Sequence, residues 1–238
     1  MSGADVTPNS TLVIPDGCMD VIFRADLDSG TITAAFCGLD EEGSFGGNVV
    51  TGSGLTATFG VRFYLWAAAI FAQDSLAGTC GAAEPAEMLF PALYREMSAV
   101  LARGHSLIMN AHAAERILLR EFAKIPDSNM MNALYHMLKS SGRASLNDLV
   151  MTTACTRKRL EQLFRENIGA APKAVTSVLR YQLLWQDIMS AEGISILDAV
   201  EKFGFYDQPH LLNDFRRRHL MTPQAAIRRA RSSFSDRL

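Results

Sequence analysis

The sequence predicts an α+β protein, with an antiparallel β-rich N-terminal part followed by an all-helical C-terminal part. Three observations predict this class. Short β-rich runs separated by turn residues fill residues 11–63, and helical patterns take over from residue 64. The last third of the chain contains two copies of a two-helix unit, which indicates a repeated helix–turn–helix.

The strand prediction rests on four runs rich in β-branched and aromatic residues, at 11–14, 19–23, 31–36 and 56–63. Turn-forming stretches separate these runs: Pro15-Asp16-Gly17, Asp28-Ser29-Gly30 and the glycine-dense residues 43–54. Short strands joined by tight turns predict an antiparallel sheet or a small barrel. We expect residues 1–10 to form a disordered lead-in.

Helical patterns predict a short helix at 65–71 and longer helices at 86–101, 106–122 and 129–138. Pro85 precedes the second of these helices, and Pro126-Asp127 separates the last two. The predicted division of the chain is a β-rich N-terminal domain at 1–104, a helical linker at 105–142 and a domain of two helix–turn–helix units at 143–238.

The repeat appears when the last third of the chain is aligned with itself. Residues 145–150, Ser-Leu-Asn-Asp-Leu-Val, resemble residues 195–200, Ser-Ile-Leu-Asp-Ala-Val, at an offset of 50. At an offset of 51, four further residues match: Thr156, Leu160, Phe164 and Pro172 correspond to Asp207, Leu211, Phe215 and Pro223. Both units open with Ser-x-x-Asp, in which the side chains satisfy the free N–H groups of a helix N-terminus. The same two-helix unit is therefore expected twice.

The second unit shows how each unit is built. Gly204 ends one short helix, Asp207 can cap the next, and Pro209 falls in the first turn, where its missing N–H costs nothing. The second helices of the two units are predicted near 156–168 and 207–219. One continuous helix at about 173–191 is predicted to join the units.

Charge is unevenly distributed along the chain, whose net charge is −2. Residues 143–238 hold 15 Lys/Arg and 10 Asp/Glu, whereas residues 1–142 hold 8 and 15. A basic C-terminal region suits a nucleic-acid partner, which would repel the acidic N-terminal region.

The four cysteines are scattered and form no Cys-x-x-Cys pair, which argues against a zinc ribbon and against a secreted disulfide scaffold. The sequence has no signal-peptide pattern and no apolar run long enough to span a bilayer. We therefore expect a cytoplasmic protein with no membrane partner.

The segment from about Ser145 to Arg228 resembles the DNA-binding domain of AraC/XylS-type transcription regulators. The residues that carry this resemblance lie in both units and in the helix between them: Leu160, Phe164, Gly169, Pro172, Arg180, Ile196, Ala199, Gly204, Phe205, His210, Leu211, Phe215, Thr222 and Pro223. The resemblance implies that the two units bind double-stranded DNA.

In regulators of this type, the helices before the DNA-binding domain often form the dimer interface. By this resemblance a second copy of the chain could pack on a face lined by Ile108, Ala111, Glu115, Leu118 and Leu119. The alternative is that this face packs onto the protein's own sheet.

The second helix of a helix–turn–helix enters the major groove, with its N-terminal residues nearest the base edges. In the first unit, Lys158, Glu161 and Gln162 are the predicted base readers, since these side chains can pair with guanine, cytosine and adenine respectively. Arg157 and Arg165 are expected to divide between bases and phosphates. The alternative for each of these residues is a solvated charged face.

In the second unit the corresponding outer positions are Gln208, Pro209, Leu212, Asn213 and Arg216. The amides of Gln208 and Asn213 can read adenine, and Pro209 or Leu212 could touch a thymine methyl group. Many relatives place an arginine where this sequence has Asn213, so the second unit is expected to read DNA more weakly or differently.

Three consecutive arginines, Arg216, Arg217 and Arg218, cannot all point one way on a helix. We expect one or two of them, with Arg216 and Arg217 as the candidates, to hold phosphate. The connecting helix of about 19 residues would be ~28 Å long, close to the ~34 Å of one turn of DNA. One monomer could then place its two units in successive major grooves.

The N-terminal part also resembles a known domain. Residues 15–20, Pro-Asp-Gly-Cys-Met-Asp, and residues 60–63, Gly-Val-Arg-Phe, resemble the N-terminal domain of one AraC-type subgroup, which implies a reduced cupin-like fold. No histidine precedes His105, so neither a cupin metal centre nor any cofactor is predicted. Asp16, Asp20 and Arg62 could contact an effector, but turn formation and a buried ion pair are the favoured explanation.

An enzyme on the N-terminal sheet is not predicted. The sequence contains no Gly-x-Ser-x-Gly and no phosphate loop. Asp16 and Asp20, if close to Cys18, would raise the pKa of its thiol, which is the wrong direction for a nucleophile.

The sequence therefore predicts a sequence-specific DNA-binding transcription regulator of the AraC family, and leaves activation or repression open. The further candidate partners are a small-molecule effector, a second copy in a homodimer, and RNA polymerase. The alternative is a constitutive regulator whose N-terminal domain only dimerises or binds a protein partner.

Overall fold

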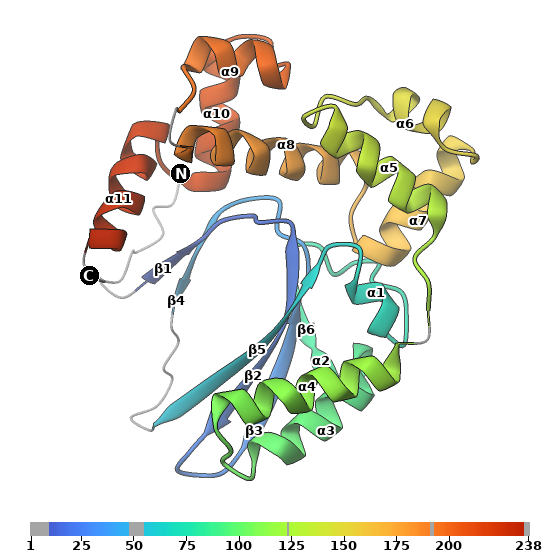
Figure 1. Ribbon diagram of the computed structural model, residues 1–238, viewed down its shortest axis with the longest axis vertical. Helices are drawn as coiled ribbons and strands as arrows, with labels where there is room; N and C mark the ends of the chain where they lie inside the picture. The colour runs from blue at the N-terminus through green and yellow to red at the C-terminus, as the bar shows by residue number, and fades with distance from the viewer. Residues whose placement is uncertain (1–9, 48–54, 123, 191–192, 236–238) are drawn as a thin grey trace.

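The computed structural model of the chain describes residues 10–47, 55–122, 124–190 and 193–235. The expected lead-in falls on residues 1–10, and residues 1–9 lie outside the described residues. A twisted antiparallel sheet occupies the middle of the molecule, helices run along one of its faces, and the C-terminal helices gather at one end (Figure 1). The predicted combination of antiparallel sheet and helical C-terminal domain is confirmed.

Within the described residues, four strands form the main sheet in the order β5-β2-β3-β6, with every neighbouring pair antiparallel. Their bounds are β2 Cys18–Asp26, β3 Ile32–Cys37, β5 Thr56–Tyr64 and β6 Ala83–Pro85. A second pair joins β1 Ser10–Val13 to β4 Ser44–Gly47. Each of the four predicted runs overlaps one of the strands β1, β2, β3 and β5, although Ile14 and Thr31 lie outside them.

The strands β4 and β6 were not predicted from the sequence. β4 has the sequence Ser-Phe-Gly-Gly and lies where a turn was expected, because two of its four residues are glycines and it is defined by backbone pairing with β1. β6 contains Pro85, which is tolerated because β6 is at the edge of the sheet.

The sheet buries one face against helices. Along β2, Met19, Val21 and Phe23 are buried and alternate with half-buried residues, as a strand with one core face requires. The helices on that face are α2 Ala86–Leu89, α3 Pro91–Leu101 and α4 Leu107–Glu121, while the short α1 Ala68–Phe71 lies near the C-terminal helices. The rings of Phe36 and Phe63 pack against Phe90 and join the sheet to this layer.

The prediction of a single helix at 86–101 was wrong, because two helices cover this range. Phe90 has φ −129° and ψ 56°, outside the helical region, between α2 and α3. Pro91 explains the break, since a proline lacks the N–H that would continue the helix and disfavours helical geometry at the preceding residue.

The C-terminal half consists of helices joined by short connections. They are α5 Ser128–Lys139, α6 Leu146–Thr152, α7 Arg157–Ile168, α8 Pro172–Met189, α9 Ile196–Phe203, α10 Gln208–His219 and α11 Pro223–Ser235. Ser145 and Asp148 form the predicted capping box before α6, and the Ser195 side chain accepts a hydrogen bond from the Asp198 N–H before α9. The predicted connecting helix at 173–191 corresponds to α8, and residues 191–192 lie outside the described residues.

Two hydrophobic cores divide the molecule unequally. The first core runs from the sheet through α4 and α5 into α6, α7 and the N-terminal half of α8. The second core is confined to the C-terminal half of α8 with α9, α10 and α11. The first helix–turn–helix unit therefore shares a core with the sheet, whereas the second unit has a core of its own.

No helix among the described residues is both long enough and apolar enough to cross a membrane.

Candidate nucleic-acid interface

The helix α7 turns one face inward and carries the predicted DNA-reading residues on the other. Thr156 caps it by accepting a hydrogen bond from the Arg159 N–H at 3.3 Å. The residues that anchor the inner face are Leu160, Leu163, Phe164 and Ile168, all buried. Of the predicted DNA-reading residues, Arg157, Lys158, Gln162 and Arg165 are exposed and Glu161 is half-buried. The structure thus brings all five to one helix surface.

Some of these side chains already have partners within the protein. Arg157 Nε lies 3.5 Å from Glu161 Oε1, and Gln162 Nε2 donates to Glu166 Oε1 at 2.7 Å. Exposed pairs of this kind are worth roughly 0.3–0.5 kcal/mol, so base edges can replace them at little cost. Among the described residues, Lys158 has no ion-pair partner, which leaves its ammonium group available to an acceptor.

The helix α10 occupies the equivalent place in the second unit. The Asp207 carboxylate caps it by accepting from the His210 N–H at 2.8 Å, and Leu211 and Phe215 are buried beneath it. Gln208, Pro209, Asn213 and Arg216 are exposed, and Leu212 is half-buried. The predicted residues of the second unit therefore also gather on one helix, with Leu212 the least accessible of them.

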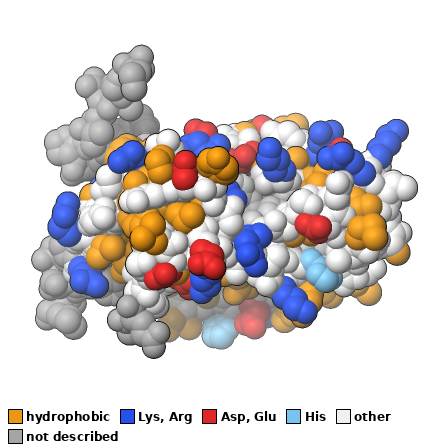
Figure 2. All heavy atoms as spheres, turned by 90° about the horizontal axis from the view of Figure 1, so that it is seen from above, with side chains coloured by type: hydrophobic (Ala, Val, Ile, Leu, Met, Phe, Trp, Pro, Cys, Tyr) orange, Lys and Arg blue, Asp and Glu red, His pale blue; other side chains and the backbone are white. Residues whose placement is uncertain are grey.

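The helix α8 sets the distance between the two units. It contains 18 residues, which at ~1.5 Å per residue makes it ~27 Å long. α6 and α7 lie beside one end of α8, and α9 and α10 beside the other (Figure 1). Seen from the side on which α8 and α9 lie, Lys and Arg side chains are spread over the surface with Asp and Glu among them (Figure 2).

Comparison with known families identifies the part of the chain that contains both units. Residues 149–229 match a family model described as a helix-turn-helix domain, which is 81 of the 238 residues. These residues form an AraC-type helix-turn-helix domain. The match supports a DNA-binding transcription regulator of the AraC type. In the comparisons with curated proteins and with solved structures, nothing matches the chain.

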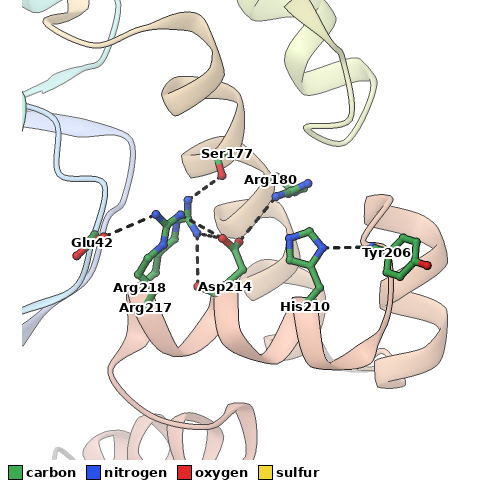
Figure 3. Close-up of polar contacts among 8 residues, drawn as sticks. All are labelled: Glu42, Ser177, Arg180, Tyr206, His210, Asp214, Arg217 and Arg218. Carbon is green, nitrogen blue, oxygen red and sulfur yellow. Dashed lines mark hydrogen bonds and ion pairs between the residues drawn. The ribbon is translucent and has the colours of Figure 1, made fainter. Parts of the chain in front are cut away.

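A buried ionic network within the AraC-type domain was missed by sequence reasoning. Asp214, in α10, accepts a hydrogen bond from Arg218 Nη1, and its other carboxylate oxygen lies 4.0 Å from Arg180 Nη2 (Figure 3). Arg218 is fully buried, and its Nη2 donates to Ser177 Oγ at 2.7 Å. Two cations and one carboxylate from α8 and α10 thus hold the second unit onto the connecting helix.

The repeat contained the signal for this network. At an offset of 51, the position of Asp214 is held in the first unit by Leu163, which is buried. A carboxylate at a core position of the repeat requires a buried cation nearby. Arg218, one helical turn later in α10, and Arg180, in the connecting helix, were the available candidates.

The three arginines of α10 take different roles. Arg216 is exposed, and Arg218 is buried in the network. Arg217 Nη2 donates to Asp214 Oδ1 at 3.2 Å, and Arg217 Nη1 lies 3.6 Å from Glu42 Oε1 of the N-terminal half (Figure 3). The expectation that the three side chains diverge is confirmed, since Arg216 and Arg217 are exposed and Arg218 is buried.

A basic pocket between α6, α7 and α8 adds two residues that sequence reasoning did not select. The pocket has a volume of about 330 Å³ and brings together Arg143, Arg157, Lys173 and Arg180. Two features of the sequence could have pointed to these residues as parts of the site. Arg143 stands two residues before the cap Ser145, and Lys173 lies in the first turn of α8.

The polar residues singled out in the N-terminal half form one cluster. Arg62 binds both oxygens of Asp20, at 2.8 and 2.9 Å, and its Nη1 lies 2.6 Å from Asp16 Oδ2. The Cys18 N–H donates to Asp16 Oδ1, and burial, followed by the Asp16 charge, raises the pKa of the Cys18 thiol. The turn and the ion pair are thus present, but the Arg62 side chain is 60% exposed, so the ion pair is not buried as expected.

We predict that Asp214→Leu lowers the free energy of unfolding by about 3–5 kcal/mol, because it leaves the fully buried Arg218 without its carboxylate. The double variant Asp214→Leu/Arg218→Met, which restores an apolar pair, should recover most of that loss. Asp28→Asn, in an exposed turn, serves as the charge-matched control and should change stability by less than ~0.5 kcal/mol. Urea unfolding followed by circular dichroism measures all three. A double variant as unstable as Asp214→Leu would contradict the role given to the ion pair.

Proposed function

We propose that the protein is a sequence-specific transcription regulator that reads two successive major-groove segments of double-stranded DNA. The observation that carries this proposal is the pair of capped helices, α7 and α10, at the two ends of α8, each with polar side chains exposed from its N-terminal turns onward. A length of ~27 Å for α8 suits two grooves one turn of ~34 Å apart. The difference in length favours some bending of the DNA toward the protein, at a cost of a few kcal/mol.

In the first segment, Lys158, Glu161 and Gln162 are the proposed base readers, with Arg157 and Arg165 shared between bases and phosphates. Lys158 is the best placed of them, because it is exposed, lies in the first turn of α7 and has no ion-pair partner among the described residues. An ammonium group there can donate to guanine O6 and N7.

In the second segment, Gln208 and Asn213 supply adenine-reading amides, and Pro209 and Leu212 supply apolar contact. Arg216 and Arg217 are the proposed phosphate contacts. The basic pocket that contains Arg143 and Lys173 lies beside the N-terminus of α7, where it can hold the phosphate backbone next to the first unit. The second unit has fewer charged side chains at its N-terminal end than the first, which favours weaker base readout there.

The acidic N-terminal half is proposed to sense an effector, and the reduced cupin-like fold remains a prediction for it. A pocket of about 430 Å³ lies between the end of the sheet and α4, lined mainly by apolar side chains such as Phe23, Phe59 and Leu101. A small apolar effector would fit there. The alternative remains a constitutive regulator whose N-terminal half only dimerises or binds a protein such as RNA polymerase.

We also propose that the protein is a homodimer that uses α4. Ile108, Ala111, Glu115 and Leu119 lie on one exposed stripe of this helix, and Leu118 is half-buried. Ile108 and Leu119 are each 70% exposed, and Phe122 extends the stripe at 56%. An apolar stripe with this exposure does not pack on the protein's own sheet, which favours the dimer over that alternative.

The function is tested first by selecting binding sites from random duplex DNA. We expect two short conserved blocks about one turn apart, and a binding constant that falls steeply with salt concentration, because two helices read bases while arginines hold phosphates. A single block would restrict base reading to one unit. Failure to enrich any sequence, with and without added apolar small molecules, would contradict sequence-specific binding.

Two substitutions separate base reading from phosphate binding. Lys158→Ala should weaken binding to the selected site by ~1–3 kcal/mol and relax the preference at one position of the first block. Arg216→Ala should weaken binding to all sequences alike and reduce the salt slope by about 1. Arg24→Ala, an exposed cation of the sheet, is the control and should change neither property. Equal, sequence-independent losses from Lys158→Ala and Arg216→Ala would contradict the proposed base reader.

The dimer is tested by placing charge on the α4 stripe. Ile108→Asp/Leu119→Asp should convert the dimer to a monomer, since like charges would face each other across the two-fold axis. Sedimentation velocity measures the mass, with Leu197→Asp, at an apolar residue of α9 that is 72% exposed and far from α4 in the sequence, as the control. A dimer that survives the double substitution, or a monomeric native protein, would contradict this interface.

A further inference from the structure

The second helices of the two units, α7 and α10, which we call the recognition helices, end in the same way. α7 ends at Gly169 and α10 at Leu220, both in the left-handed conformation, with φ 80° and 56°. In each, the N–H of this residue donates to the carbonyl four residues earlier, Arg165 or Arg216. The next carbonyl, of Glu166 or Arg217, is among those that a helix end leaves without an intrahelical donor. These two carbonyls are equivalent, at an offset of 51 in the repeat.

The N-terminal half supplies a backbone donor to the first of these carbonyls. The Leu76 N–H donates to the Glu166 carbonyl at 2.8 Å, and the Ser75 hydroxyl approaches the same oxygen at 3.4 Å. A Cβ added to Gly169 would meet the Leu76 carbonyl oxygen and the Thr79 hydroxyl, both at 2.7 Å, so the two segments touch closely. The first unit also shares the hydrophobic core of the sheet.

The N-terminal half supplies a backbone donor to the second carbonyl as well. The Gly43 N–H donates to the Arg217 carbonyl at 3.1 Å, and the preceding residue, Glu42, forms the ion pair with the Arg217 side chain (Figure 3). The approach is close, because a Cβ added to Gly43 would lie 2.2 Å from the Arg218 carbonyl oxygen. These contacts come from residues 40–43, Asp-Glu-Glu-Gly, which we call the acidic loop.

Leu220 gives a further sign that this contact is built into the fold. A non-glycine residue in the left-handed conformation costs roughly 1–2 kcal/mol. The equivalent residue of the first unit is a glycine, Gly169, whereas Leu220 places its side chain 3.2 Å from where a Gly43 Cβ would lie. The second unit thus adopts this unfavourable backbone conformation directly beside the acidic loop.

The two contacts differ in what surrounds them. The first unit is joined to the sheet by a continuous hydrophobic core, but the second unit has its own core. Among the described residues, the second unit is connected to the rest through the single helix α8, by the contacts of the acidic loop, and by the Arg143 side chain, which lies close to Gly204. A single helix that passes between two cores can bend. The acidic loop is therefore placed to fix the angle of the second unit.

We propose that the acidic loop is a brace, which means that it fixes the position of α10. It binds the Arg217 carbonyl of α10, which is equivalent to the Glu166 carbonyl that Leu76 binds in α7. The brace thereby sets the spacing between the two DNA blocks that the protein accepts. This inference rests on the proposed reading of two segments. Both backbone donors, at Leu76 and Gly43, belong to the N-terminal half. A conformational change there that moves the acidic loop would therefore shift the second unit, and so the accepted spacing, while the first unit stays in place.

The brace is tested with the variant Glu42→Gln/Gly43→Ala, which removes the ion pair and drives the loop off the Arg218 carbonyl. Glu42→Gln alone is a milder version, and Gly60→Ala, whose added Cβ meets nothing within 4 Å, is the matched control. Binding is measured to duplexes that carry the two selected blocks at the native spacing and with one base pair added or removed.

The native protein and Gly60→Ala should lose about 10-fold in affinity for a change of one base pair, since it moves and rotates the second block relative to the first. For the same change in spacing, the double variant should lose less than about 3-fold in affinity, and it should keep the same base preferences within each block. A double variant as sensitive to spacing as the native protein overturns the brace, and so does a native protein that tolerates every spacing.

Hydrogen exchange on the full chain without DNA tests the brace independently of the function. The Gly43 amide should exchange slowly in the native protein, and the amide of residue 43 at least about 10-fold faster in the double variant. Fast exchange of Gly43 in the native protein overturns the brace even if two blocks are read. Slow exchange in a protein that selects no DNA sequence confirms the hold of the acidic loop on α10 but contradicts the proposed function, and with it the role of this hold in setting the spacing.

Discussion

The structure depends on one constraint, the continuity of α8 between two hydrophobic cores. Val175, Val178 and Leu179 of its N-terminal half belong to the first core, and Leu184 and Ile188 of its C-terminal half belong to the second. Neither helix–turn–helix unit can bury its apolar face without this helix, because α7 and α10 each pack against it. The helix that completes both cores therefore also fixes how far apart the two units stand.

The two units are repeats in sequence, but different forces stabilise them. In the first unit, the position of Leu163 is apolar and the unit merges with the core of the sheet. In the second unit, the equivalent Asp214 holds Arg218 and faces Arg180, and the guanidinium of Arg180 lies 4.3 Å from the centre of the Phe205 ring. A buried ionic group is weak evidence for stability and is best understood as specifying one arrangement. Here it specifies how α10 sits on α8, where no sheet supports it.

Local patterns in the sequence predicted most of the elements, and contacts between distant segments explain what was missed. The caps at Ser145, Thr156, Ser195 and Asp207 depend only on residues within one turn, so their positions could be read directly. The strand β4 and the contact of Gly43 with α10 depend on partners more than thirty residues away. Asp214 is an intermediate case. Its alignment with Leu163 in the repeat shows that a carboxylate occupies a core position, but the alignment does not identify Arg218 as its partner.

The charges of the two halves are consistent with the way they meet. The N-terminal half carries more Asp and Glu than Lys and Arg, so DNA would repel it. Among the described residues, its backbone hydrogen bonds to α7 and α10 are accepted by the carbonyls of Glu166 and Arg217, at the C-terminal ends of the two helices. The base-reading residues of a helix–turn–helix lie toward the opposite, N-terminal ends. Within the part of the chain that the structure describes, the acidic N-terminal half thus holds α7 and α10 at their C-terminal ends, away from the N-terminal turns where the proposed base readers lie.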